Sequence, residues 1–204
     1  MSCVPRTGGV RELAEPIARK ISVIAIESKW ATRFVWAAII QGGLTVLLSI
    51  FLLLGEMRVL PMRVSLLISA TVPGIWIVLG YFAYVIVGVV GMAVTALFYQ
   101  YLEVNLKRPY GGSNQSLAWL HLILSNVGIL ATSWLVIYAG YLTAVATLPS
   151  RLGGMGLTLE QAQESILGNL LIPITFFAVV TILGISLGGV GYVLVYRARS
   201  GEAS

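Results

Sequence analysis

The only histidine of the chain, His121, stands out for its chemistry because it lies in an apolar run, LAWLHLILSNVG, at residues 117–128. A neutral imidazole is a frequent axial ligand of haem iron. Lys107 and Arg108 precede the run, and their charges could neutralise haem propionates. One histidine supplies one axial bond, so a second ligand would come from another subunit, a symmetry-related copy or a methionine such as Met92. The alternative is a histidine that forms a hydrogen bond between helices or near an interface with water, and the sequence leaves both roles open.

No other residues have the types and spacing of a catalytic site. The sequence contains no nucleophile beside its base, no phosphate-binding loop and no multi-histidine metal motif, and its one cysteine, Cys3, excludes an internal disulfide. Glu160 and Glu164 would share one helix face, as a solvated face or as a cation site. The long apolar segments have no central Asp, Glu, Lys or Arg, whereas ion-coupled transporters and pumps usually do. We therefore do not expect a stand-alone enzyme.

The composition is that of a membrane protein. Of the 204 residues, 58% are hydrophobic and 10% are charged, and the mean hydropathy is +0.92. A soluble domain has about 25% charged residues. Only helices and closed barrels satisfy their backbone within hydrocarbon, and continuous rather than alternating apolar runs select helices. Juxtamembrane Lys and Arg explain the net charge of +5, so we expect lipid and no nucleic acid as a partner.

Four stretches are long enough to cross a bilayer, which takes about 20 apolar residues. They are residues 34–54, 74–101, 117–142 and 166–196. Residues 62–73 are apolar but shorter, and form either a re-entrant segment or an extension of the second helix. We predict an all-α fold, a polytopic integral membrane four-helix bundle over residues 34–196.

The two ends of the chain differ from this bundle. Residues 1–33 alternate apolar and charged side chains at helical spacing, which is typical of an amphipathic juxtamembrane helix or of a docking helix for a partner. Residues 197–204 form a short polar tail. Most basic residues lie in residues 1–33, in the loop after the second apolar segment and in the tail. The positive-inside rule therefore places both termini in the cytoplasm or on the matrix-like side of an organelle. We expect the membrane to be that of a prokaryotic cell, with both termini in the cytoplasm.

Small and weakly polar residues recur at intervals of three or four along each apolar segment, so each set shares one helix face. Such faces allow close helix packing in lipid, where van der Waals contact and hydrogen bonds hold helices together. They could also receive a flat ligand such as a porphyrin, or a second subunit. Gln41, Asn126 and Asn169 are candidates for hydrogen bonds between helices. The predicted helix-packing residues are Gly42, Thr45, Gly88, Gly91, Ser125, Gly128, Gly184, Gly188 and Gly191.

The third apolar segment, WLHLILSNVGILATSWLVIYAGYLTAVATLP, resembles the histidine-bearing helices of the catalytic subunit of haem-copper oxidases and nitric oxide reductases. Those helices have a histidine near one end, a glycine two turns later and a proline after the span, which His121, Gly128 and Pro149 match. The family's oxygen-reducing centre needs several histidines, and this chain has one. The resemblance therefore implies a degenerate relative or a small partner of a respiratory assembly rather than a complete catalytic subunit.

Three hypotheses for the function follow. The first is a non-catalytic membrane subunit of a larger complex, a respiratory or other oxidoreductase assembly, without a cofactor of its own. The second is a haem-b-binding electron carrier that uses His121, with Lys107 and Arg108 beside the propionates. The third is a small permease or channel component that acts as a homo-oligomer with a glycine-lined passage.

Overall fold

The computed structural model describes residues 28–60 and 63–197, and within these residues every regular element is helical. Four helical segments are long and apolar enough to cross a membrane, as predicted. The first is α2 (Lys29–Glu56) and the third is α6 (Ser113–Thr147). The second joins α4 (Ile75–Ala83), the π-helical turn η2 (Tyr84–Val90), α5 (Gly91–Gln100) and the π-helical turn η3 (Tyr101–Asn105). The fourth joins α7 (Leu159–Ala162), the π-helical turn η5 (Gln163–Leu167) and α8 (Gly168–Arg197).

The helices extend beyond the predicted apolar spans. The first begins at Lys29 rather than at residue 34, because Ser28 caps it by accepting a hydrogen bond from the backbone N–H of Ala31 at 3.0 Å. The Ser28 hydroxyl also donates to the carboxylate of Glu103, which places a negative charge at the positive end of the helix dipole. The predicted amphipathic helix falls mainly on residues 1–27, outside the described residues, as does the tail from residue 198.

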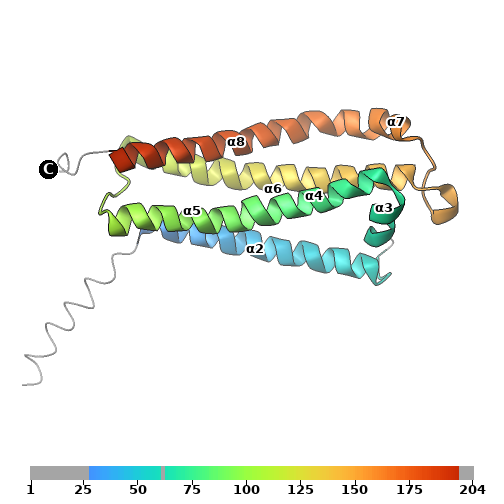
Figure 1. Ribbon diagram of the computed structural model, residues 1–204, viewed down its shortest axis with the longest axis horizontal. Coiled ribbons are helices and arrows are strands. Elements are labelled where there is room, and N and C mark those ends of the chain that lie inside the picture. Colours follow the sequence, from blue (N-terminus) through green and yellow to red (C-terminus); the bar gives the residue numbers. More distant parts are fainter. Residues whose placement is uncertain (1–27, 61–62, 198–204) are drawn as a thin grey trace, which may run out of the picture.

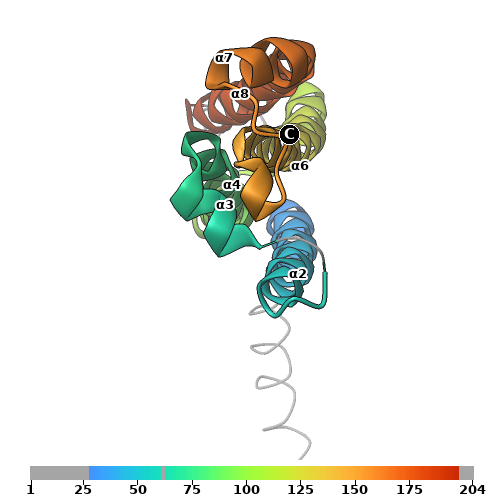
Figure 2. The same cartoon turned by 90° about the vertical axis from the view of Figure 1, so that its right-hand side faces the viewer.

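Consecutive long helices run antiparallel, so the Lys29 end of α2 and the Arg197 end of α8 lie at the same end of the molecule (Figure 1). Seen end-on, α4 and α6 occupy the middle, with α8 on one side and α2 on the other (Figure 2). The main contacts join α6 with α8, α4 with α6, and α2 with α5. The second helix therefore packs on α6 through its first half and on α2 through its second half.

Residues 62–73 form neither a continuous extension of the second helix nor a simple loop. Val64–Ala70 make a separate short helix, α3, which ends at Thr71 in an extended conformation. The 3-10 turn η1 (Val72–Gly74) then leads into α4. The chain reverses tightly here, because a Cβ atom at Gly74 would overlap the backbone of Leu67. The residue at this corner consequently has to be a glycine.

Two buried clusters hold the helices together at opposite ends. The larger is mainly aromatic and includes Trp30, Phe34, Tyr99 and Tyr110. The smaller is aliphatic and joins α3, α4 and α6 through residues such as Leu67 and Ile77. The ring of His121 packs against Phe34 of the aromatic cluster. The only histidine of the chain therefore lies near the end where α2 and α6 begin.

Candidate functional site

His121 projects from α6, roughly two turns after the start of that helix, and only 7% of its surface is exposed. This agrees with the prediction that it faces protein. Its ring lies 5.0 Å from the ring of Phe34 on α2, measured between centroids. The hydroxyl of Tyr99 on α5 is 3.3 Å from its Nδ1 atom. His121 therefore joins α2, α5 and α6 as a hydrogen-bonding residue between helices.

The other neighbour of the imidazole is a glycine. A Cβ atom at Gly188 on α8 would overlap Nδ1, Cε1 and Cγ of the His121 ring. Gly188 is buried, whereas the adjacent Gly189 is exposed and has nothing within 4 Å of a Cβ built there. The fourth helix thus presents one glycine to the histidine and a second glycine to open space.

A crevice of about 420 Å³ opens beside this histidine, between α5 and α8. It exists because the second helix leaves α6 after α4 and packs on α2 instead. The rings of Phe98 and Tyr192 meet across it at 5.6 Å. We name this feature the His121 crevice. Its lining residues are Val87, Gly91, Met92, Thr95, Phe98, Tyr99, His121, Ile185, Gly188, Gly189, Tyr192 and Val193.

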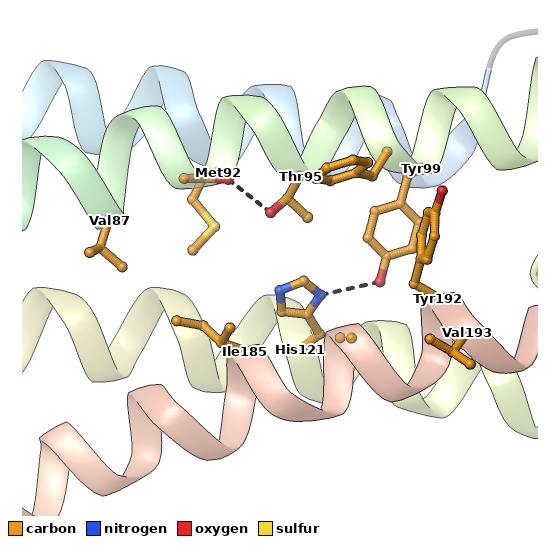
Figure 3. A pocket seen from close by; sticks show the side chains of 12 residues that line it. Val87, Met92, Thr95, Tyr99, His121, Ile185, Tyr192 and Val193 are labelled. Atoms are coloured by element: carbon orange, nitrogen blue, oxygen red, sulfur yellow. Dashed lines mark hydrogen bonds between the residues drawn. The ribbon is translucent and has the colours of Figure 1, made fainter.

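The two ring nitrogens of His121 have different surroundings. Figure 3 shows Nδ1 facing the Tyr99 hydroxyl and the other nitrogen, Nε2, directed toward Met92 and Ile185. Within the described part of the chain, no hydrogen bond reaches Nε2. The hydroxyl of Thr95, another polar group of the lining, already donates to the carbonyl of Gly91 at 2.8 Å. Nε2 is therefore an unpaired hydrogen-bonding atom beside the crevice.

The contact between the Tyr99 hydroxyl and Nδ1 of His121 can form in two ways, because either atom can be the donor. A neutral imidazole whose Nδ1 accepts the phenol proton has its own proton on Nε2. In that tautomer the crevice presents an N–H donor in an apolar surrounding, and in the other tautomer it presents a nitrogen lone pair.

A network of hydrogen-bonded polar side chains also connects three helices. The Tyr84 hydroxyl donates to the side-chain oxygen of Gln41, and Gln41 Nε2 donates to Asn126 Oδ1 at 3.0 Å. Asn126 in turn donates to the carbonyl of Leu122 at 2.7 Å. The prediction that Gln41 and Asn126 bond between helices is confirmed. The prediction was wrong for Asn169, whose exposed amide donates within its own helix to the carbonyl of Ser165.

Tyr84 was not singled out from the sequence, although it is completely buried. It sits at the start of the π-helical turn η2, where a helix accommodates one residue more than a regular α-helical turn. The buried positions before and after that turn include Gly80, Tyr84, Gly88 and Met92. Their regular spacing of four is the signal that would have revealed both Tyr84 and the turn.

The small-residue face of α6 lies against α8 in antiparallel order. Cβ atoms built at Gly128 and Gly184 would meet Thr181 and the backbone of Ser125 respectively. Gly191 is looser, since its Cβ would lie 3.5 Å from Leu117. Close approaches that sequence reasoning missed occur between α4 and α6, where a Cβ at Gly80 would meet Ile137 and one at Gly140 would meet Trp76. A second small-residue face on α6, formed by Ser133, Gly140 and Ala144, was the signal available for them.

The other predicted packing residues have weaker contacts. A Cβ at Gly42 would lie 3.9 Å from Val89, and Thr45 donates to the carbonyl of Gln41 in its own helix at 2.9 Å. A Cβ at Gly88 would lie 3.2 Å from the Tyr84 ring. Gly91 lines the His121 crevice. The buried residue of that helical turn is its neighbour Met92, because the extra residue in η2 rotates the following positions around the helix axis by one residue.

Of the residues named for haem binding, Met92 lines the same crevice as His121, whereas Lys107 and Arg108 do not. Lys107 is exposed, and the guanidinium of Arg108 lies 5.7 Å from the ring centre of Tyr196 on the outer part of α8. Neither residue lines the His121 crevice. Glu160 and Glu164 are exposed, and no cluster of three or more His, Cys, Asp or Glu side chains occurs in residues 28–60 and 63–197. The site is thus built from one imidazole, phenols and glycines.

No family model matches the chain, and no curated protein or solved structure matches it. A function for this protein therefore has to follow from its own geometry.

Proposed function

We propose that the protein is an integral membrane protein that serves as a non-catalytic subunit of a larger membrane complex, of the oxidoreductase class. The observation that carries this proposal is how few neighbours the outer helices have. α2 packs mainly on the second helix, and α8 mainly on α6. In their most apolar windows only 11% of the residues are buried, against 28% in the two inner helices.

Such one-sided packing leaves helix faces free for other subunits. In lipid, helices associate through close contact and hydrogen bonds rather than through hydrophobic burial, so a free face costs little until a partner arrives. The exposed face of α2 includes Trp36 and Gly43, and no side chain lies within 4 Å of a Cβ built at Gly43. A smooth glycine beside a large aromatic residue suits docking of another helix.

Charge distribution supports an orientation with the termini in the cytoplasm. Lys29, Arg33, Lys107 and Arg108 lie toward the end of the molecule where α2 begins. Arg58, Arg63 and Arg151 lie at the opposite end. Basic loops stay on the cytoplasmic side during insertion.

Cysteine labelling tests insertion and orientation together. In a Cys3→Ser background, Gly111→Cys and Arg151→Cys place single thiols in loops at opposite ends of the helices. An impermeant maleimide added to intact cells should label Arg151→Cys and should label Gly111→Cys only after the cells are opened. Release of the protein from membranes by alkaline carbonate would contradict insertion, and the reverse labelling pattern would contradict the orientation.

Mild detergent extraction tests the subunit role. The protein, tagged and expressed from its own chromosome, should purify with larger membrane subunits in a fixed ratio. A stable isolated monomer with no partner in fixed ratio would contradict the proposal. A pure homo-oligomer would also contradict it, and would favour the third hypothesis, the permease or channel component.

The haem hypothesis is favoured by one observation, the unpaired Nε2 atom of His121 facing a crevice. Purified protein supplied with haem would then show a Soret band that is lost in His121→Ala. A glycine-lined passage through a single chain has less support, because Gly128, Gly184 and Gly188 are filled by the neighbouring helix. Flux in proteoliposomes that is abolished by Gly189→Leu would favour a passage formed between copies.

A further inference from the structure

We propose that the His121 crevice binds a neutral, lipid-soluble ring compound with a carbonyl oxygen, of the quinone class, through a hydrogen bond from His121 Nε2–H. This inference rests on the membrane location proposed above, but not on partner subunits, since this chain supplies every lining residue.

The first support is that His121 is buried while one of its ring nitrogens has no hydrogen-bond partner in the described part of the chain. His121 is more than nine-tenths buried, yet its Nε2 atom has no partner in the described residues and is directed into the crevice. Polar atoms in apolar surroundings usually have a hydrogen-bond partner. A ligand with an oxygen at this position would supply that partner.

The second support is the contact between the Tyr99 hydroxyl and Nδ1. The proposal assigns the phenol as the donor in this contact, and the proton of the imidazole then lies on Nε2. The ligand atom is in that case an acceptor, and a ring carbonyl is one. A haem iron would instead need the lone pair of Nε2, and a metal-bound histidine usually donates its other N–H to a carboxylate or a carbonyl. A phenol that donates to Nδ1 is the reverse of that arrangement.

The third support is the lining. It contains no charged side chain, so a neutral ligand suits it and a phosphate group does not. Its surfaces are flat: Gly91 and Gly189 have no side chain to cover the helix backbone, and Phe98, Tyr99 and Tyr192 offer aromatic rings. The volume of about 420 Å³ lies within the range of small-molecule sites.

The lining residues lie within the apolar helical spans, between α5 and α8, rather than in the loops at the ends of the molecule. A ligand dissolved in the bilayer would enter directly from the lipid. The prenyl tail of a quinone could remain in the acyl chains while the ring occupies the crevice. Phospholipids share the carbonyl group, but their phosphate would find no cation among the lining residues.

The single histidine makes a direct test available. Protein grown with ¹⁵N-histidine and purified through a histidine-free tag gives one imidazole signal set, that of His121. In phosphatidylcholine nanodiscs the ¹⁵N spectrum should show the proton on Nε2. Decylubiquinone, added as a rising mole fraction of the lipid, should shift the Nε2–H signal with saturation.

Two glycines provide a matched pair of variants. Gly189→Leu fills the crevice, and Gly43→Leu adds the same side chain to α2 outside it; neither side chain meets another atom within 4 Å of its Cβ. The shift should be retained in Gly43→Leu and lost in Gly189→Leu. Quinone that remains bound to protein purified from native membranes should fall about tenfold in His121→Phe, which removes one hydrogen bond.

The contrary results are equally definite. An Nε2–H signal that does not respond to decylubiquinone, or an equal response in Gly189→Leu and Gly43→Leu, would overturn the inference. A response to phosphatidylglycerol that matches the response to the quinone would assign the crevice to phospholipid instead. A Soret band lost in His121→Phe would assign it to haem.

Discussion

At the scale of single residues, the aromatic cluster contains two tyrosines whose hydroxyl groups differ in their hydrogen bonding. The hydroxyl of Tyr99 is paired with Nδ1 of His121, whereas the buried hydroxyl of Tyr110 has no partner among the described residues. Burial also raises the pKa of Tyr110, which lies in the loop before α6, so that its hydroxyl stays protonated at any physiological pH.

We expect Tyr99→Phe to lower the free energy of unfolding by about 1 kcal/mol, because it leaves His121 Nδ1 unpaired while the stacking on Phe34 remains. Tyr110→Phe should leave stability unchanged or raise it, since it removes a buried polar atom without a partner. Thermal unfolding in detergent measures both. Equal losses in the two variants would show that ring packing alone matters at this position.

The polar chain through Tyr84, Gln41 and Asn126 permits a test of coupling. A double-mutant cycle of Gln41→Ala and Asn126→Ala should give a coupling energy of about 0.6 kcal/mol, typical of hydrogen bonds between membrane helices. Asn169→Ala is the control, because its exposed amide bonds only within its own helix, and it should not couple with Gln41→Ala. Additive effects of Gln41→Ala and Asn126→Ala in unfolding measurements would rule out a direct bond.

At the scale of elements, the contact between α6 and α8 depends on glycines that touch backbone. A Cβ at Gly184 would lie 2.6 Å from the amide nitrogen of Ser125 and 3.0 Å from the carbonyl carbon of Leu124. Main-chain atoms of a helix cannot move aside as a flexible side chain can. Gly184→Leu should therefore separate the two helices and destabilise the protein by at least 1–3 kcal/mol, roughly the cost of overpacking.

Gly189→Leu on the same helix is the matched control, because a Cβ there meets nothing within 4 Å. It should unfold at the same temperature as the unaltered protein. A similar loss of stability in both variants would mean that helix propensity or insertion, rather than contact with α6, governs the effect.

Much of this element-level picture could be predicted from the sequence. Four continuous apolar runs were sufficient to predict the four helices, since a helix satisfies its own backbone hydrogen bonds along such a run. The helix ends could not be placed, because Ser28 and Glu103 decide where α2 begins and they are distant in the sequence. That His121 lies on a protein-facing stripe was predictable from its spacing to Ser125 and Gly128.

The crevice could not be predicted, because it depends on how the second helix changes partners. Regular spacing placed Gly91 on the packing face, whereas Met92 holds that position in the structure. The π-helical turn η2 causes the difference, since it absorbs one extra residue and shifts the helix phase. The outward placement of Arg108 over Tyr196 likewise depends on a loop conformation, with Lys107 at a positive φ of 54°.

At the scale of the whole molecule, the four helices form a row more than a closed square, with α2 and α8 at its edges (Figure 2). A closed square would bury its polar groups from all sides. A row instead leaves openings between helices that are not neighbours. The His121 crevice lies between α5 and α8. A second opening, also lined without charged side chains, lies between α2, α4 and α6 near Trp134 and Tyr138.

The π-helical turn η2 determines where one residue can be deleted from the second helix without rotating the rest of that helix. Deleting a residue inside a membrane helix normally turns everything beyond it by about 100°. Residues 84–90 already contain a surplus residue, so deletion of Val87 should restore a regular helix and leave Tyr99 pointing at His121. Deletion of Val94, in the regular part of α5, should swing Tyr99 away from it. Since the chain has one histidine, its ¹⁵N spectrum would register the difference as a proton that stays on Nε2 in the first variant and is free to exchange between the two nitrogens in the second.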